Sequence, residues 1–333
     1  MFSVRIITTL AFLMFLTPSL AFATGGGGGP PLDLKILVVN DDGFDTEGIE
    51  ALREALTAAG HDVTVVAPAT QQSGKGGSIN TGVFDFTPGG GTMQLALHEH
   101  DTWSLAGTPA DALKAGLDIV LASDPPDLVV TGLNEGQNLG KAGSNTSGTE
   151  GAALAATFAG IPAIAGSVGI DISEQGSGFP STGDAYAPAA AFMVRLIDDL
   201  TAANGTRILP RRVRMLNVNF PVPYDEIQGV RVTRLGDGSD LGLPLFDPSQ
   251  GFPPFGIPGI PNFPPCSIVD QPGEFCFATV GVDFGTGEPN AVPNSDIDAH
   301  AAGFISITPY DTDMGAGIWP GIVTAIQLNG LTP

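Results

Sequence analysis

Basic side chains are scarce in this chain. It has 13 lysines and arginines against 35 aspartates and glutamates over 333 residues, which gives a formal net charge of −22. Such an acidic surface repels polyanions, and sequence-independent binding to nucleic acids depends on basic contacts to phosphates. The charge balance therefore excludes nucleic acid polymers and anionic membranes as bulk partners.

Long apolar runs are also rare. The run Ile6–Leu16 follows Arg5 and precedes Ala21-Phe22-Ala23, the small-x-small pattern that signal peptidase reads. This run is shorter than a membrane-spanning helix needs, and no later segment is long and apolar enough to be one. We expect residues 1–23 to be a signal peptide, so that the protein is exported to the periplasm or secreted. A retained lipid or membrane anchor is the alternative.

Cysteine is nearly absent. Cys266 and Cys276 lie close together in a proline-rich stretch. In an exported protein, a local disulfide between them is the natural expectation, and two free thiols are the alternative. Neither cysteine has a partner at the spacing typical of a zinc site.

The body of the chain alternates between short apolar runs and helical patterns. Residues 36–39 and 63–67 are continuous apolar runs, typical of strands buried on both faces, and Ile49, Leu52 and Leu56 repeat at helical spacing between them. Further strands are expected at 127–131, 161–165, 213–218, 230–235 and 303–309, with a weaker pair within 83–105; further helices are expected after a Thr108 cap, up to Phe158 and over 184–202. The pattern predicts an α/β fold with a Rossmann-like, doubly wound, mostly parallel sheet.

Composition divides the chain into segments. Residues 24–31 are a glycine and proline linker, and 32–235 carry the α/β pattern. Residues 236–302 are rich in proline and glycine, which favours an extended arm or hairpin that could reach a neighbouring subunit. Regular patterns return at 303–309 and 322–328, so we expect residues 303–333 to return to the core or to a partner subunit.

The first strand ends in Asn40, Asp41, Asp42 and Gly43. In an open α/β sheet the carboxyl ends of the strands are where ligands bind. Two adjacent aspartates repel each other unless a cation lies between them, so a hard divalent ion is the simplest explanation. The alternative is a plain turn, for which Asn-Asp-Asp-Gly is also suitable.

Two more polar loops should leave the same rim of the sheet. One surrounds Ser73, and the other runs from Gly132 to Gly151. Together with the first loop they carry segments that resemble the SurE family of metal-dependent nucleotide phosphatases. The matching segments are, in family order, ILVVNDDGFDTEGI, VVAPATQQSGKGGSI, GTPADALK, PDLVVTGLNEGQNLG, SGTEGA, LNVNFP and GFISITP.

The resemblance implies roles for individual residues. The metal ligands of the family fall on Asp41, Asp42, Ser73 and Asn134, which offer only oxygen donors and so suit Mg²⁺ or Mn²⁺. The phosphate-contacting loop falls on Ser147, Gly148 and Thr149, at the expected start of a helix, with Asn40 and Asn138 as further contacts. Asp41 and Asp42 would be the catalytic carboxylates, and the proton acceptor is open between Asp42 and a metal hydroxide.

Three of the four lysines lie in or beside these loops, namely Lys75, Lys114 and Lys141. In so acidic a chain, this placement would locally offset the repulsion of an anionic substrate. The alternative is that loops simply carry lysines.

The resemblance implies a metal-dependent phosphomonoesterase that hydrolyses nucleoside 5′(3′)-monophosphates, a 5′-nucleotidase, and we expect it to act as a homodimer or homotetramer. A phosphatase without nucleoside preference and a non-catalytic exported binding protein with the same fold are the alternatives.

Overall fold

The structure is a computed structural model that describes residues 32–80, 91–204, 208–210, 212–238, 241–242, 245–246, 279–280, 283–284 and 290–311. The expected signal peptide and linker, Cys266 and Cys276, and the pattern at 322–328 lie outside these residues. Within the described ranges, no helix combines the length and the apolar character that crossing a membrane requires.

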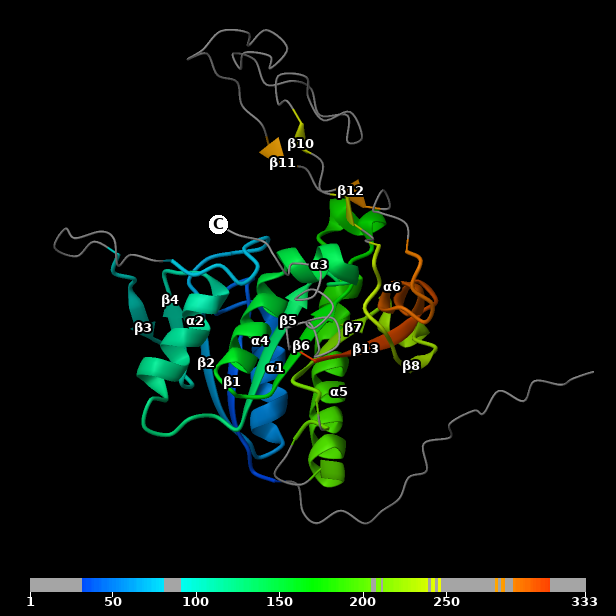
Figure 1. The fold of residues 1–333 in the computed structure, drawn as a ribbon. Coiled ribbons are helices and arrows are strands. Elements are labelled where there is room, and N and C mark those ends of the chain that lie inside the picture. Colours follow the sequence, from blue (N-terminus) through cyan, green and yellow to red (C-terminus); the bar gives the residue numbers. More distant parts are fainter. Residues whose placement is uncertain are drawn as a thin grey trace, which may run out of the picture.

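A nine-stranded sheet forms the centre of the molecule (Figure 1), in the order β3-β4-β2-β1-β5-β6-β7-β13-β8. The strands from β4 to β7 in this order are parallel to their neighbours; β3 runs antiparallel to β4, and β13 antiparallel to β7. Their bounds are β1 Lys35–Val39, β2 Asp62–Pro68, β3 Leu95–Leu97, β4 Thr102–Leu105, β5 Leu128–Glu135, β6 Ala163–Val168, β7 Met215–Phe220, β8 Gly229–Val232 and β13 Phe304–Tyr310.

Helices cover both faces of the sheet, as the continuous apolar strands predict. Their bounds are α1 Glu47–Ala58, α2 Pro109–Ala115, α3 Gly140–Thr146, α4 Gly148–Phe158, α5 Pro180–Asn204 and α6 Asp296–Ala301. Short turns of other helix types span η2 Gly116–Val120, η3 Ile172–Ser177 and η4 Tyr224–Glu226. Two small antiparallel pairs, β10 Leu245–Phe246 with β11 Thr279–Val280 and β12 Asp283–Phe284 with β9 Leu241–Gly242, stand apart from the sheet.

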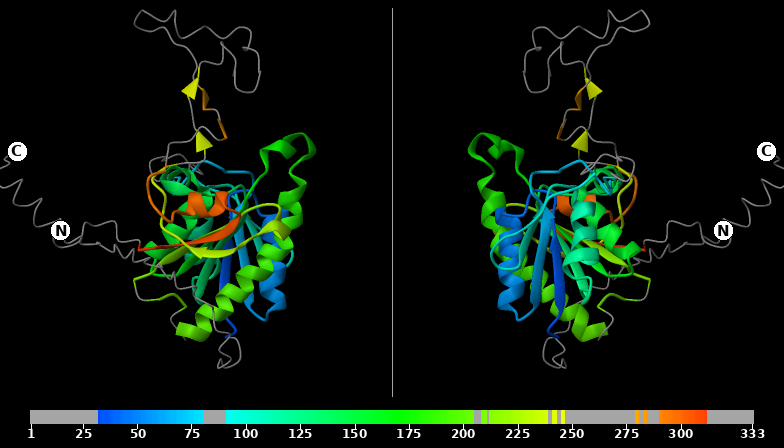
Figure 2. Two further views of the ribbon diagram at one scale, coloured as in Figure 1. Left: turned by 90° about the vertical axis from the view of Figure 1, so that its right-hand side faces the viewer. Right: turned by 90° about the vertical axis from the view of Figure 1, so that its left-hand side faces the viewer.

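The core has two halves, one on each side of the sheet (Figure 2). Helices α1 and α5 cover one face, where Ile49, Leu52 and Leu56 are fully buried at the predicted helical spacing. Helices α2 and α4 cover the other face with a smaller, alanine-rich layer. Small side chains bring α4 close to the sheet, and this closeness positions the loops at its start.

The doubly wound, mostly parallel fold is confirmed, but three elements differ from the predictions. Strand β5 continues to Glu135, so Asn134 lies in the strand and not in the loop after it. The predicted loop between Gly132 and Gly151 contains α3 and the start of α4, which its glycine and serine content concealed. Helix α5 begins at Pro180, four residues early, because proline suits the first helical position.

Helix α6 lies inside the stretch assigned to the arm and packs on the body. Asp296, at its start, has no exposed surface. Its carboxylate accepts hydrogen bonds from the backbone N–H groups of Gly140 and Gly236, 3.0 and 2.8 Å away. Since Gly140 begins α3, Asp296 fastens the loop after β5 to the segment that follows β8.

Candidate metal and phosphate site

The site lies at the carboxyl ends of the central strands. From β1 the chain passes to β2 on one side, and β5 lies on the other side of β1. Such a switch point leaves a crevice beyond the strand ends in doubly wound folds. The loops after β1 and β2 and the end of β5 therefore meet there.

Asn40 organises the turn after β1. It is fully buried, its Oδ1 accepts the N–H of Gly43 at 3.1 Å, and its Nδ2 donates to Thr46 Oγ1 at 3.2 Å. Both polar groups of the Asn40 side chain thus form hydrogen bonds inside the turn. The turn is therefore confirmed, and it holds Asp41 and Asp42 at the end of β1, where the metal site is predicted.

Asp41 points toward the start of α4. It is 3% exposed, and its Oδ1 accepts the hydroxyl of Thr149 at 2.5 Å. Burial raises the pKa of Asp41, while the Thr149 hydroxyl and the backbone N–H groups of Gly148 and Thr149 counteract the rise. A Cβ on Gly148 would lie 2.8 Å from Asp41 Oδ2. Glycine is therefore required here for the helix start to approach the carboxylate.

Asp42 is turned toward β5 and the loop after β2. Its Oδ2 accepts the backbone N–H of Glu135 at 2.9 Å, and its Oδ1 accepts Gln71 Nε2 at 3.2 Å. Burial, followed by repulsion from Asp41, raises the pKa of Asp42 to about 7. Two neighbouring carboxylates are thus held where each disfavours the charge of the other, which a bound cation would reverse.

Gln71 links Ser73 to Asp42. The Nε2 of Gln71 donates both to Ser73 Oγ, at 2.8 Å, and to Asp42 Oδ1. The same loop is fixed to the end of α3, since Gly76 donates its N–H to Thr146 O at 3.0 Å. It also lies against α4, where a Cβ on Gly151 would lie 2.3 Å from the Gly76 carbonyl carbon. Two glycines at this crossing allow the backbones to touch.

Asn134 is buried at the end of β5. Its Nδ2 donates to the backbone carbonyls of Glu135 and Gly136, at 3.2 and 2.5 Å. These bonds orient the amide at the end of the strand. The carbonyl-type oxygen of an amide is a normal partner for a hard divalent cation.

Asn138 is held by its backbone between two asparagines of β7. Its N–H donates to Asn219 Oδ1 at 2.7 Å, and its carbonyl accepts Asn217 Nδ2 at 2.9 Å and Asn219 Nδ2 at 3.0 Å. Its own Nδ2 donates to Ser167 Oγ at 2.9 Å. Asn138 is therefore fixed by β6 and β7 beside the start of α3.

Ser147 caps α4 and ends α3. Its hydroxyl accepts the N–H of Glu150 at 3.0 Å. The predicted phosphate loop is thus the first turn of α4, and its Thr149 hydroxyl is directed at Asp41. A helix start supplies unpaired N–H groups and a positive dipole end, which stabilise a carboxylate as they would a phosphate.

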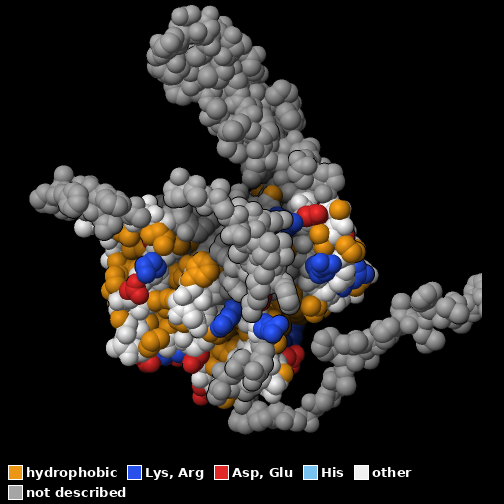
Figure 3. Space-filling view, in the orientation of Figure 1, with side chains coloured by type: hydrophobic (Ala, Val, Ile, Leu, Met, Phe, Trp, Pro, Cys, Tyr) orange, Lys and Arg blue, Asp and Glu red, His pale blue; other side chains and the backbone are white. Residues whose placement is uncertain are grey.

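The three lysines differ in their surroundings. Lys75 and Lys141 are exposed in the loop after β2 and at the start of α3. Lys114 pairs with Asp118 one turn further along, 2.9 Å away, at the end of α2 that is distant from Thr108. Figure 3 shows basic side chains as separate blue spots on the face in view.

The donor set fits a hard cation. Asp41 and Asp42 are adjacent carboxylates with raised pKa values. Gln71 bonds to both Asp42 and Ser73, and Asn134 directly precedes Glu135, whose N–H bonds to Asp42. Among the described residues, no group of three or more His, Cys, Asp or Glu side chains could hold a metal. A softer metal that prefers nitrogen or sulfur ligands would therefore find no suitable set in that part of the chain.

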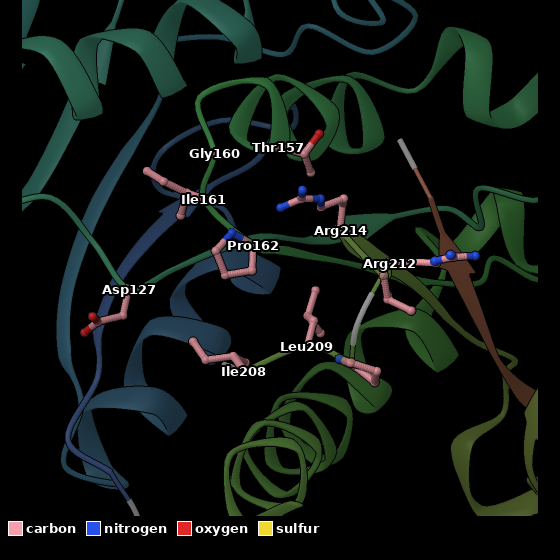
Figure 4. Close-up of a pocket in the computed structure, with 11 residues that line it drawn as sticks. Asp127, Thr157, Gly160, Ile161, Pro162, Ile208, Leu209, Arg212 and Arg214 are labelled. Atoms are coloured by element: carbon pink, nitrogen blue, oxygen red, sulfur yellow. The ribbon is translucent and has the colours of Figure 1, made fainter. Parts of the chain in front are cut away.

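A pocket of about 540 Å³ lies at the other end of the strands, where their amino ends are (Figure 4). It is lined by residues that precede strands, including Asp127 before β5, Pro162 before β6 and Arg214 before β7. The predicted site residues do not line it. It is therefore separate from the candidate site.

Several residues of the site were not foreseen from the sequence. Gln71, Glu150, Asn217 and Asn219 each bond to a predicted site residue or to its neighbour. The one available signal was the alternation of Asn217 and Asn219 in a strand, where both are fully buried. Buried amides in a strand require partners, so such a pair indicates a polar network.

Together these observations define a Rossmann-like α/β protein with a largely buried pair of carboxylates at its switch point. A family model described as survival protein SurE matches residues 36–240. The chain belongs to the SurE family.

Individual relatives agree with this assignment. The 5′-nucleotidase SurE of Thermosynechococcus vestitus is 34% identical over 290 residues, which cover 86% of this chain and 94% of the relative. That of Xylella fastidiosa is 33% identical over 282 residues, covering 84% and 91%. The crystal structure of the SurE protein from Aquifex aeolicus has a TM-score of 0.62 and 29% identity, and the match covers 89% of this chain and 99% of that one.

Proposed function

We propose that this chain is a divalent-cation-dependent phosphomonoesterase that hydrolyses nucleoside 5′(3′)-monophosphates. The observation that supports the proposal is the pair of carboxylates Asp41 and Asp42, which bond to the start of α4, to the end of β5 and, through Gln71, to the loop of Ser73. Membership of the SurE family and relatives named 5′-nucleotidase support the substrate class.

Asp41, Asp42, Ser73 and Asn134 would hold Mg²⁺ or Mn²⁺. When bound, the ion would supply positive charge that polarises a phosphoryl oxygen and lowers the pKa of a water molecule. The oxygen-only donor set supports these two ions over zinc.

The surrounding residues keep these donors in place. The hydroxyl of Thr149 orients Asp41, and the backbone N–H of Glu135 orients Asp42. The first turn of α4, with Ser147 and Gly148, would stabilise negative charge that develops on the phosphoryl group. Asn138, Lys75 and Lys141 would contact the phosphate or attract it. Lys114 would contribute only long-range charge. Asn40 would act indirectly, by fixing the turn that carries Asp41 and Asp42.

Phosphate release from a nucleotide panel tests the proposal. The panel should contain adenosine, guanosine and cytidine monophosphates and a simple aryl phosphate, each assayed with EDTA, with Mg²⁺ and with Mn²⁺. We expect release from the nucleotides, loss of activity with EDTA and recovery with one of the ions. Equal rates on the aryl phosphate would favour a general phosphatase, and ion binding without turnover would favour a binding protein.

We also propose that the protein is exported with removal of residues 1–23. The support is the sequence pattern around Arg5 and Ala21-Phe22-Ala23. The mass of the mature protein from its own cell fractions tests this, because an intact start in the cytoplasm would contradict it.

We further propose a homodimer or homotetramer. Strand β8 lies at the edge of the sheet, and its Val230 and Val232 are 45% and 61% exposed. An apolar edge strand is a ready surface for pairing with another chain. Light scattering over a concentration series should give a mass of two or four chains, and a monomer at all concentrations would contradict the proposal.

A further inference from the structure

Glu150 is a buried acid in the first turn of α4 whose surroundings a capping role does not explain. A glutamate at this helical position usually reaches back to the backbone N–H of the cap residue. Glu150 is instead 4% exposed, and its Oε1 accepts Ser144 Oγ and Asn217 Nδ2, each at 3.1 Å. The Tyr310 hydroxyl, itself 2.9 Å from Ser144 Oγ, also bonds to the carboxyl group.

The partners of Glu150 come from elements that surround the site. Ser144 belongs to α3, Asn217 to β7 and Tyr310 to β13. The Nδ2 of Asn217 also donates to the carbonyl of Asn138, so one amide joins Glu150 to the predicted phosphate contact. The chain Glu150-Asn217-Asn138 thus links the first turn of α4, which holds Asp41, to the loop after β5.

Among the described residues, no basic side chain pairs with this carboxyl group. Its partners are the Ser144 hydroxyl, the Asn217 amide and the Tyr310 phenol, and the charged group that acts on it is Asp296 of α6, which has the same sign. Burial first, and Asp296 in addition, raise the pKa of Glu150 to about 8, against the opposing hydrogen bonds from Ser144 and Tyr310. Burial also raises the pKa of Tyr310, so the phenol stays neutral.

One acceptor of the cluster lacks a donor. Asn217 Oδ1 is buried without a hydrogen-bond partner among the described residues. Buried polar groups are normally paired, so this amide is the one incompletely paired member of the described cluster. The burial of the carboxyl group without a basic partner in the part of the chain that the structure describes favours its neutral state.

We propose that Glu150, in its neutral acid form, is a positioning residue that fixes the first turn of α4 and Asn138 in one relative arrangement. Ionisation would place a second buried negative charge near Asp296, whose carboxylate holds the start of α3, and the repulsion would separate α3 from α4. The start of α4 would then move relative to Asp41, and turnover would fall. This inference rests on the proposed phosphatase function of the same site.

The test is the pH dependence of kcat and KM between pH 6 and 9.5 for the wild type and Glu150→Gln. Glutamine keeps the size and the acceptor oxygen but cannot ionise. We expect the kcat of the wild type to fall near pH 8. Glu150→Gln should keep at least half of the wild-type kcat at pH 7 and show no such fall at alkaline pH. Glu226→Gln, the same change at an exposed position on η4, should leave the fall unchanged.

A second variant gives a signature that a merely structural role would not produce. The hydroxyl of Tyr310 favours the charged form of Glu150, so Tyr310→Phe should move the alkaline fall to higher pH. An identical alkaline fall in the wild type, Glu150→Gln and Tyr310→Phe would overturn the inference. So would a kcat of Glu150→Gln reduced tenfold or more at every pH.

Thermal unfolding separates this inference from the proposed function. An acid whose folded pKa is raised makes the protein lose stability as pH rises from its ordinary pKa toward the raised one. The wild type should therefore have a Tm that falls more steeply between pH 6 and 9 than that of Glu150→Gln. If the wild type releases no phosphate from nucleotides, the proposed function is wrong. If the Tm values of the wild type and Glu150→Gln change in parallel with pH, the inference that Glu150 is neutral is wrong.

Discussion

The hydroxyl of Thr149 lies 2.5 Å from Oδ1 of Asp41, although 108 positions separate the two residues in the sequence. Thr149 lies in the first turn of α4, and Asp41 lies in the turn after β1. This contact joins the carboxylate turn to the helix start, and several consequences can be measured.

Thr149→Val should reduce kcat/KM by about 10- to 100-fold, because a misoriented carboxylate weakens charge stabilisation at the reacting group. The loss of the donor should also raise the pKa of Asp41 further, since the hydroxyl favours its charged form. Steady-state kinetics on a nucleoside monophosphate measures the effect. Thr157→Val is the matched control, because that hydroxyl bonds to Leu154 O on the same helix; equal losses in both variants would contradict the role of Thr149.

Gly148→Ala should reduce both stability and turnover, although it adds only one methyl group. The added Cβ would lie 2.8 Å from Asp41 Cβ and 2.9 Å from Pro109 Cγ, so the helix start must move away from the carboxylate. We expect a Tm lower than the wild type and a loss of detectable turnover. Gly176→Ala, where a Cβ meets no atom within 4 Å, should retain both; full activity of Gly148→Ala would show that the close approach is not needed.

His300 should make the protein sensitive to acid. Burial lowers the pKa of His300 to about 4, although a hydrogen bond with the Phe220 backbone opposes the change. Because the folded pKa is below the ordinary 6.5, the unfolded chain binds more protons between these values, and stability falls as pH drops through this window. The loss would amount to about 3 kcal/mol at most.

Urea unfolding of His300→Gln at pH 7 and pH 4.5 measures this effect. The variant should lose less stability than the wild type on acidification, while His100→Gln, at an exposed position, should lose as much as the wild type. Parallel losses in the wild type and His300→Gln would mean that the histidine does not titrate differently on folding.

Local patterns were sufficient to predict much of the fold. The buried run at β1 and the helical spacing of Ile49, Leu52 and Leu56 reflect burial on a face, which sequence records directly. Helix α2 was predicted from Thr108 and Pro109, and the structure has a complete capping box there. Helix α3 was not predicted, because glycine and serine have low helix propensity and its position depends on contacts with Gly236 and Asp296.

The candidate site was predictable only where its chemistry is local. Two adjacent aspartates at a strand end are visible in the sequence, and the structure brings the Ser73 loop and the end of β5 to them. The link between Glu150 and Asn217 spans 67 residues, and nothing in the local pattern around Glu150 distinguishes a buried acid from a capping one. Long-range polar contacts of this kind depend on how the layers pack.

The central claim is that side chains from β1, the loop after β2 and β5 form one cation site. Titration of Mn²⁺ into the protein, followed by electron paramagnetic resonance of the free ion, tests it directly, with Asp41→Asn beside the exposed control Asp225→Asn. We predict one tight site per chain in the wild type and the control, and its loss in Asp41→Asn. Unchanged Mn²⁺ binding in Asp41→Asn would contradict the account.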